Sequence, residues 1–249
     1  LGTDPEEVPD LKFRLAELYA DKARDFFFQG QEKDDAIIRA DADGEKAALE
    51  AEKAELLQAS KDWALKALKV YADIRANHPD YPRMPEVLFA LGQAHWTAGE
   101  KEAALKPYAE LIREYPKSPL VAEAWIAFGE YYFDEGDVRK ALQSYEKAAE
   151  DKRSRVYGFA LYKQGWCHYN LARWREALRA FETTVLYSQM SEELSGENKI
   201  ALGREAEADW VRTYVHVGTS KKARFELMRL LGVDECAGRC VKLLEGLAG

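Results

Sequence analysis

The chain has few of the residues that build catalytic and metal centres. Its 249 residues include three cysteines and four histidines, and these do not fall into the Cys and His spacings of a zinc site. The sequence also lacks a glycine-rich phosphate-binding loop and a nucleophile motif. We therefore expect a protein without enzyme activity, without a cofactor and without a bound metal.

Long apolar segments are also absent from the sequence. It contains no run of 18 or more apolar residues, so it predicts no membrane-spanning helix. The chain begins at Leu1 rather than at a methionine. This start indicates a processed or trimmed chain, in which any signal peptide or lipid anchor is out of view.

Basic residues are too few to balance the acidic ones. The chain has 36 Lys and Arg against 44 Asp and Glu, a net charge of -8. Residues 1–60 alone hold 8 basic and 16 acidic residues, so the whole excess of acid lies there. Because nucleic acids and anionic membranes bind clustered basic residues, we expect a protein or peptide partner and no nucleic acid.

Small and aromatic residues recur with a fixed spacing in the middle of the chain. Gly92, Gly129 and Gly165 are 37 and 36 residues apart. Each is followed by a ring after three residues, an alanine after twelve and a second ring after sixteen. These residues are His95, Tyr132 and His168, then Ala104, Ala141 and Ala177, then Tyr108, Tyr145 and Phe181. Such spacing lets one helix approach the next at the small residues while the large ones fill the space between them.

The spacing resembles the signature of the tetratricopeptide repeat (TPR) family. The resemblance implies an all-α fold, a right-handed TPR superhelix or α-solenoid that binds other proteins. Gln164 in place of Leu and Arg153 in place of Pro depart from the signature. Residues 124–133 and 160–171 further resemble extracytoplasmic TPR proteins of deltaproteobacteria, such as those of the myxobacterial gliding-motility (Agl/Glt) envelope complex. They are more distantly similar to Tol-Pal accessory and outer-membrane assembly proteins.

Helical periodicity divides the chain into four parts. The first is an acidic capping hairpin with an atypically long second helix, followed by three regular repeats, a degenerate fourth repeat and the first helix of a truncated further repeat. Their ranges are 1–79, 80–190, 191–233 and 234–249. The truncated repeat would leave an apolar face that allows self-association.

Local signals place the helix ends. In the hairpin, Asp10 is expected to cap the first helix, and Gly44 to interrupt the pattern before a helix over residues 45–76. Pro107 predicts a kink or a later helix start, and Met190–Asn198 is expected to be a loop. The helices of the regular repeats are expected at 84–98, 101–115, 119–135, 138–151, 155–171 and 174–188, with Pro79, Pro82, Pro85, Pro116 and Pro119 between repeats.

The resemblance also implies a binding surface, because TPR proteins build their concave wall from the first helix of each repeat. The corresponding groove consists of Phe89, Gln93, Trp96, Ile126, Glu130, Phe133, Phe159, Tyr162, Trp166 and Tyr169. Two interpretations remain open. A partner segment lies over these rings, or neighbouring helices cover them as core.

The sequence leaves alternatives open for the wider function. The chain is a binding module in a bacterial cell-envelope assembly, or a structural subunit that assembles through its terminal faces. The envelope resemblance implies a periplasmic or outer-membrane-associated location, with the cytoplasm as the alternative. Cys236 and Cys240 are expected to be free thiols, because their β-carbon directions four residues apart on a helix fit a disulfide poorly. The alternative is a bridge between them, which would require an oxidising compartment.

Overall fold

The structure is a computed structural model that describes residues 7–40, 42–195, 202–232 and 240. Its described part contains ten α-helices and no strand, which confirms the predicted all-α fold. The handedness of a superhelix stays a prediction. The helices are α1 (Val8–Arg39), α2 (Asp43–Asn77), α3 (Met84–Thr97), α4 (Lys101–Glu114), α5 (Val121–Asp134), α6 (Val138–Ala148), α7 (Tyr157–Asn170), α8 (Trp174–Ser195), α9 (Gly203–Tyr214) and α10 (Ser220–Leu231).

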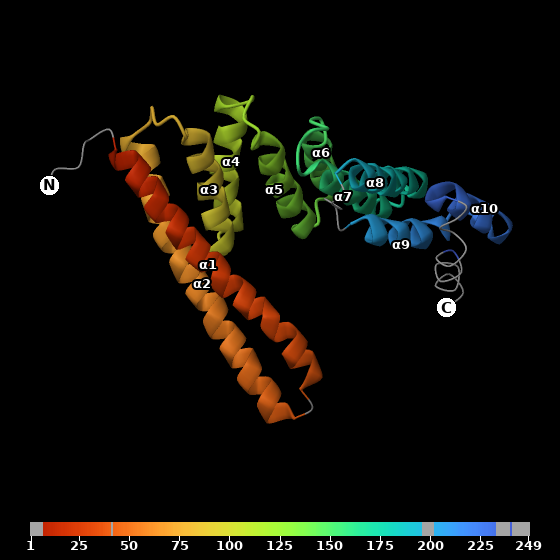
Figure 1. The fold of residues 1–249 in the computed structure, drawn as a ribbon, viewed down its shortest axis with the longest axis horizontal. Coiled ribbons are helices and arrows are strands. Elements are labelled where there is room, and N and C mark those ends of the chain that lie inside the picture. Colours follow the sequence, from red (N-terminus) through yellow and green to blue (C-terminus); the bar gives the residue numbers. More distant parts are fainter. Residues whose placement is uncertain (1–6, 41, 196–201, 233–239, 241–249) are drawn as a thin grey trace. The chain divides into compact units, whose positions relative to one another are not determined.

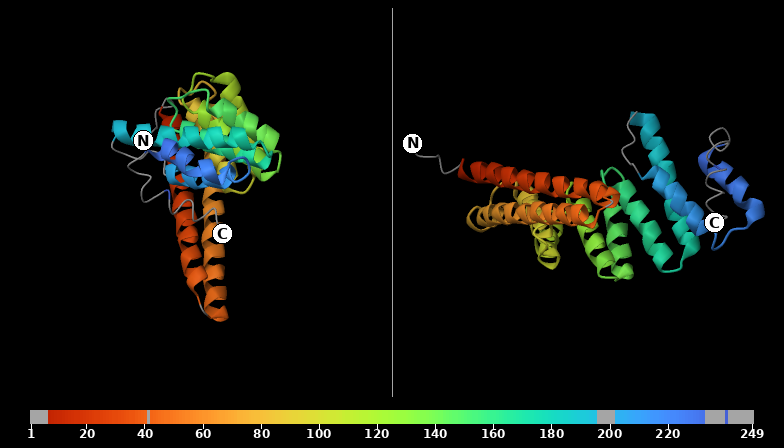
Figure 2. Two further views of the ribbon diagram at one scale, coloured as in Figure 1. Left: turned by 90° about the vertical axis from the view of Figure 1, so that its right-hand side faces the viewer. Right: turned by 90° about the horizontal axis from the view of Figure 1, so that it is seen from below.

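The chain divides into two compact units, residues 1–124 and 125–249, with the division inside α5. In the first unit, α1 and α2 lie side by side as an antiparallel hairpin (Figure 1, Figure 2). Helix α3 packs on α2, and α4 packs on α3. The core of the hairpin near these two helices includes the buried side chains of Phe13, Tyr71 and Ile74.

The hairpin is much longer than the helices packed on it. Helices α1 and α2 have 32 and 35 residues, whereas α3 and α4 have 14 each. At about 1.5 Å per residue, the longer pair extends roughly 30 Å further. Beyond Ala23 the only buried residue of α1 is Gly30, and the buried residues of α2 begin at Ser60. Residues 24–59 therefore form a two-helix arm without a third packing layer, which we call the hairpin arm.

Two expectations for the hairpin were wrong. Asp10 is not the N-cap, because α1 already begins at Val8, and the Asp10 carboxylate accepts a hydrogen bond of 2.6 Å from the Tyr81 hydroxyl instead. Gly44 does not interrupt the helices, since α2 begins at Asp43. Ion pairs between the two helices, Lys33 to Glu52 at 2.7 Å and Lys53 to Asp34 at 2.5 Å, hold together the stretch in which the apolar pattern weakens.

The second unit continues the succession of packed helices. Helix α6 contacts α7, α7 contacts α8, and α8 contacts α9. The expected loop at Met190 is wrong at its start, because α8 continues to Ser195. The predicted helix over residues 234–249 lies outside the described residues, as does Cys236. Cys240 is buried and disulfide-bonded, so the expectation of a free thiol was wrong for this residue. Cys167 is a buried free thiol.

Pro107 lies inside α4 without shifting its start. The helix begins at Lys101, so the alternative of a later start is wrong. The Pro107 side chain is buried. The other prolines of the repeats lie where they were expected. Pro79 and Pro82 lie in the connection between α2 and α3, Pro85 lies in the first turn of α3, and Pro116 and Pro119 lie between α4 and α5.

Each signature glycine lies against the second ring of its own helix pair. A β-carbon built on Gly92 would be 2.3 Å from the Tyr108 ring, one on Gly129 would be 2.3 Å from the Tyr145 ring, and one on Gly165 would be 2.5 Å from the Phe181 ring. Real β-carbons do not approach other atoms so closely. The predicted close contact at the glycines is confirmed, and it lies between the two helices of one pair.

The fourth pair keeps this spacing with different residues. Val211 of α9 stands where the other pairs have glycine, and Leu227 of α10 stands sixteen residues later in place of the ring. Both side chains are buried in the same core cluster. The fourth pair therefore has two residues of intermediate size at the positions where the other pairs have a small residue and a large one.

The turns within the helix pairs require a left-handed residue. Gly99 and Gly136 have φ angles of 86° and 78° in the turns that follow α3 and α5. The equivalent turn between α7 and α8 contains Ala172, with a φ angle of 54°. A β-carbon makes this conformation unfavourable by about 1–2 kcal/mol. Ala172 is thus the strained member of the three turns.

Replacing Ala172 by glycine should stabilise the protein. The left-handed strain disappears, and the greater freedom of glycine in the unfolded chain offsets part of the gain, so we expect about 0.5–1 kcal/mol. Urea denaturation of Ala172→Gly measures the effect, with Gly99→Ala and Gly136→Ala as controls that should change stability in the opposite direction. A lower midpoint for Ala172→Gly would contradict the strain.

Candidate protein-binding surface

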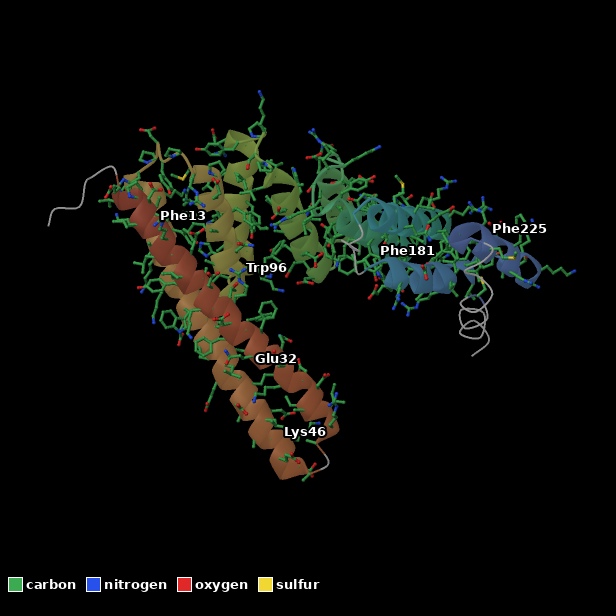
Figure 3. All side chains as sticks on the ribbon, in the orientation of Figure 1. Phe13, Glu32, Lys46, Trp96, Phe181 and Phe225 are labelled. Atoms are coloured by element: carbon green, nitrogen blue, oxygen red, sulfur yellow. The ribbon has the colours of Figure 1, made fainter. Side chains whose placement is uncertain are left out.

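Three of the predicted groove residues lie on α3, in the first unit. The half-buried Phe89 ring is 5.6 Å from the buried Tyr108 ring, which the close contact at Gly92 holds in place. Trp96 is half-buried, with the Lys101 ammonium 5.0 Å from its ring centroid (Figure 3). Gln93 is exposed. This surface thus offers an apolar ring, an indole and a free amide on one helix.

The remaining groove residues lie in the second unit, where α5 and α7 share a charged pair. The Lys163 ammonium lies 3.0 Å from the Glu130 carboxylate, and the buried Tyr145 hydroxyl donates a 2.5 Å hydrogen bond to the same oxygen. Burial, and then this bond to Glu130, raises the pKa of Tyr145 well above its usual range. The phenol therefore stays neutral and remains a hydrogen-bond donor.

Aromatic rings surround the Lys163 ammonium. Its nitrogen is 4.5 Å from the Phe133 centroid, 5.7 Å from that of Tyr145 and 5.8 Å from that of Phe159. Only 16% of the Lys163 side chain is exposed. Ring faces and one carboxylate thus replace most of the water around the ammonium. The result is an aromatic surface of α5 and α7 with a positive charge set into it.

A second polar network joins α7 to α9. The Tyr162 hydroxyl donates a 2.8 Å hydrogen bond to the buried carboxylate of Asp209, and the Arg212 guanidinium donates another of 2.8 Å. Arg212 also lies over the Trp166 ring at 5.6 Å. Burial, and further the Asp209 carboxylate, raises the pKa of Tyr162 to about 12. The carboxylate therefore holds the first helices of two successive repeats together.

An aromatic cluster ends this surface. The Tyr169 hydroxyl lies 3.4 Å from the His216 ring nitrogen, and the His216 ring stacks on Trp174 with centroids 4.0 Å apart and planes 9° apart. Trp174 is the first residue of α8, and His216 follows α9. The cluster thus connects the turn after α7 with the end of α9.

The groove residues of the second unit are half-buried rather than open or fully enclosed. Tyr162, Trp166 and Tyr169 pack against the core cluster around Phe181, and their outer edges meet the polar groups of α9. Ile126 and Phe133 pack against the cluster that contains Tyr145. The same rings therefore pack between helices and are partly exposed at the surface. Whether a partner segment or the neighbouring helices cover them stays open.

Three charged residues of this surface were not predicted. Lys163, Asp209 and Arg212 act through partners 33, 47 and 46 residues away in sequence, Glu130, Tyr162 and Trp166. Sequence spacing identifies neighbours on one helix, but it does not identify pairs across helices. The one available signal was Lys163 itself, the only Lys or Arg in the otherwise aromatic α7.

The histidines at the ring positions of the repeats have different surroundings. His95 pairs with Glu100, with Nδ1 and the carboxylate oxygen 2.7 Å apart. His168 has a buried Nδ1 without a hydrogen-bond partner. Burial, and further the positive charge of Arg173, lowers the pKa of His168, while Glu176 and Glu146 act in the opposite direction. His168 is therefore held in its neutral form.

The lowered pKa of His168 predicts a loss of stability in mild acid. The unfolded chain, with a histidine pKa of about 6.5, binds the proton more tightly than the folded protein. The contribution of His168 is therefore complete above that pH and is lost as the pH falls through it. His168→Tyr, which introduces the residue found at Tyr132, should remove this part of the pH dependence. Urea denaturation at about pH 7.5 and 5.5 tests it, and equal losses in both proteins would contradict the assignment.

Metal-ligand clusters and membrane-spanning helices are absent from the described part of the chain. Within it, His, Cys, Asp and Glu form no group of three or more that could hold a metal ion. No described helix is both long and apolar enough to cross a lipid bilayer. The surface of aromatic and charged residues on the first helices therefore stands as the candidate functional site.

Comparisons with known proteins find similar repeats. Two family models described as tetratricopeptide repeat match residues 52–119 and 159–186. A search of curated proteins returned no match to the chain. Among solved structures, one of nearly identical TPR-like repeats from a protein of Podosopora anserina described as a kinesin light chain is similar with a TM-score of 0.56 and 13% identity. The likeness covers 92% of this chain and 98% of that chain. BtubC (BKLC) from P. vanneervenii has a TM-score of 0.46 and 14% identity over 97% of this chain and 92% of that one.

These findings define the structural class of the protein. The chain is an α-helical repeat protein, because successive helix pairs repeat one contact. The likeness of fold at a TM-score of 0.56 agrees with this class. The two family-model matches show that residues 52–119 and 159–186 are similar to tetratricopeptide repeats, and the structural likeness supports the same fold. Tetratricopeptide repeats imply a scaffold for protein–protein interaction, and proteins of this kind are generally non-catalytic.

Proposed function

We propose that the chain is a non-catalytic scaffold that binds a protein segment on the first helices of its repeats. In the second unit the segment contacts Phe133, Phe159 and Trp166, and an acidic group of the partner faces the ammonium of Lys163. In the first unit the corresponding contacts are Phe89 and Trp96. Aromatic side chains are enriched in protein interfaces because they bury a large area with few rotatable bonds.

The observation that carries this proposal is the environment of Lys163. The Lys163 side chain is only 16% exposed, and its ammonium lies between three rings and one carboxylate. The charge is therefore ordered before a partner binds. Glu130 neutralises the positive charge of Lys163 only in part, because the same carboxylate oxygen also accepts a hydrogen bond from the Tyr145 hydroxyl. A preorganised charge among rings gives an acidic, partly apolar segment both affinity and orientation.

Partner capture by surface variants tests the proposal. Wild-type protein and the variants Trp96→Gln and Lys163→Gln are immobilised, and proteins captured from an envelope fraction of the source cells are quantified by mass spectrometry. We expect the specifically captured partner to fall at least about tenfold with either variant, as for a contact near the centre of an interface. Circular dichroism establishes that both variants are folded.

Control variants separate this surface from the rest of the molecule. Lys106→Gln removes an exposed lysine from α4, and Leu186→Gln replaces an exposed leucine of α8. Neither side chain belongs to the first helix of a repeat, so capture should be unchanged. Equal capture by wild type, Trp96→Gln and Lys163→Gln would remove the first helices from the binding site.

We further propose a bacterial cell-envelope location, periplasmic or at the outer membrane, in an assembly like that of gliding motility. The support is the resemblance of residues 124–133 and 160–171 to extracytoplasmic TPR proteins. The disulfide at Cys240 is also a state that an oxidising compartment favours. Fractionation of the source cells tests this location, and protein found only in the cytoplasmic fraction with reduced cysteines would contradict it.

A further inference from the structure

Helix α10 exposes an aromatic ring where the other repeats have polar side chains. Phe225 is 69% exposed and stands two residues after Ala223, the signature alanine of the fourth pair (Figure 3). The residues at the same place in the second helices of the three regular pairs are Lys106, Gln143 and Arg179, and all three are exposed. A large apolar side chain at a solvent position is costly unless a partner covers it.

The charges around Phe225 are basic. Helix α10 contains four Lys and Arg against one Glu, the highest net positive charge of the ten described helices. Lys221 and Lys222 lie one turn before Phe225 on the same side of the helix. The side chains of Lys221, Lys222 and Arg224 have no hydrogen-bond or ion-pair partner among the described residues, whereas that of Arg229 is paired with Glu182 and Glu226. Phe225 with Lys221, Lys222 and Arg224 forms what we call the α10 patch.

Helix α1 carries a stripe of the opposite charge. Its exposed residues at alternating spacings of three and four are Leu18, Asp21, Asp25, Phe28, Glu32 and Asp35. This spacing places them on one face of the helix, and Glu32 is seen on the hairpin arm in Figure 3. Leu18 and Phe28 are 65% and 57% exposed. Asp25 and Glu32, which flank Phe28 by one turn on either side, have no partner among the described residues.

We propose that the α10 patch of one copy of the chain docks on the α1 stripe of a second copy. The two surfaces are complementary in kind, because each presents an exposed phenylalanine beside charged side chains, basic on α10 and acidic on α1. Contact between Phe225 and Phe28 removes both rings from water, and Lys221 and Lys222 meet Asp25 and Glu32 at the rim. The α10 patch lies on the second helix of the fourth pair, so the inference does not rest on the partner site proposed for the first helices of the repeats.

The contact predicts a particular kind of association. A 12-residue helix gives a small interface, so binding should be weak and should depend on protein concentration. The two surfaces differ, so the contact is head-to-tail and adds further copies instead of closing at a dimer, unless a ring closes. Because the rim is ionic and exposed, salt should weaken the association.

Sedimentation of the full chain tests the proposal. At about 50 mM salt the weight-average mass should rise steadily with protein concentration, and at about 500 mM salt it should stay near that of a monomer. The double variants Lys221→Glu with Lys222→Glu, and Asp25→Lys with Glu32→Lys, should each weaken the association at least about tenfold. An equimolar mixture of the two double variants should associate again, with the two variants alternating along the assembly, because each α10 then faces an α1 of opposite charge.

Control variants and competing outcomes make the test decisive. Glu45→Lys with Glu50→Lys has the same net charge as the α1 variant, but these residues lie on α2, so association should not fall. Phe225→Gln keeps every charge and should still weaken the association. A monomer at low salt and high concentration, an equal loss with the α2 control, or no association in the mixture of reversed variants would each overturn the proposal. A monomer that instead cosediments with vesicles of anionic lipid would also overturn it, because the patch would then bind membrane.

Discussion

Gly129→Ala is expected to lower the free energy of unfolding by about 2 kcal/mol, although alanine is the better helix former. The substitution gains up to about 1 kcal/mol of helix propensity. The new β-carbon would lie 2.3 Å from the ring of Tyr145, which is fully buried and hydrogen-bonded to Glu130, so the ring has no free space to move into. Overpacking of this kind costs about 3 kcal/mol, which is more than the gain in helix propensity.

Urea denaturation followed by circular dichroism measures the effect of this substitution. Gly44→Ala is the matched control, because the β-carbon there meets nothing within 4 Å, and it should be neutral or stabilising. Adding Tyr145→Leu to Gly129→Ala should recover part of the loss, because the smaller side chain leaves space for the new β-carbon. A stability of Gly129→Ala equal to or above that of wild type would show that Tyr145 is not packed as described.

Phe181→Ala should be more damaging, with a loss of about 3–5 kcal/mol. The ring is fully buried, lies against Gly165, and has the rings of Tyr162 and Trp166 at 5.8 and 6.1 Å. Removing it leaves a cavity in the core of the second unit and takes away the support beneath two residues of the candidate binding surface. Partner capture should therefore fall together with stability.

Leu186→Ala is the control for this second prediction. Leu186 lies on the same helix, but it is 45% exposed, so its loss should cost no more than about 1 kcal/mol. Both variants are compared in urea denaturation, with tryptophan fluorescence as a second probe. A Phe181→Ala protein within about 1 kcal/mol of wild type would mean that Phe181 is not in a packed core.

The regular repeats could be predicted from sequence because their signals are local and redundant. Glycine, ring and alanine recur at fixed offsets, prolines lie in or beside the connections between pairs, and Gly99 and Gly136 supply left-handed turns. Helices α3 at Met84–Thr97 and α4 at Lys101–Glu114 end within one residue of the expected positions, whereas α6 ends three residues before its expected end and α8 ends seven residues after it. The glycine contacts followed from the same spacing, because a close approach of two helices excludes a β-carbon.

The hairpin could not be predicted as well, because its distal part has almost no core. The apolar pattern there is weak, since only two helices meet and Gly30 is the only buried residue of α1 beyond Ala23. Ion pairs such as Lys33 to Glu52 and Lys53 to Asp34 take over the role of apolar contacts. Charged residues on a helix look alike in sequence whether they are paired or not, so the sequence pattern does not predict how far α1 extends.

The chemistry of the candidate site was only half predictable. The rings of Phe133, Phe159 and Trp166 follow from their repeat positions, but the contact of Lys163 with Glu130 depends on how α5 and α7 pack. The same is true of Asp209, a buried carboxylate that accepts hydrogen bonds from Tyr162 and Arg212. Tertiary packing decides whether such a charge is solvated or becomes a connection between helices.

The contact between signature glycines and rings is tested most directly by nuclear magnetic resonance of protein with selectively labelled glycine and aromatic residues. Nuclear Overhauser effects should connect the α-protons of Gly92, Gly129 and Gly165 with the rings of Tyr108, Tyr145 and Phe181, respectively. The α-protons should also be displaced by the ring currents, while Gly44 shows neither effect. Three glycines with unshifted α-protons and no contact to these rings would contradict the stacked helix pairs on which the fold and the binding surface depend.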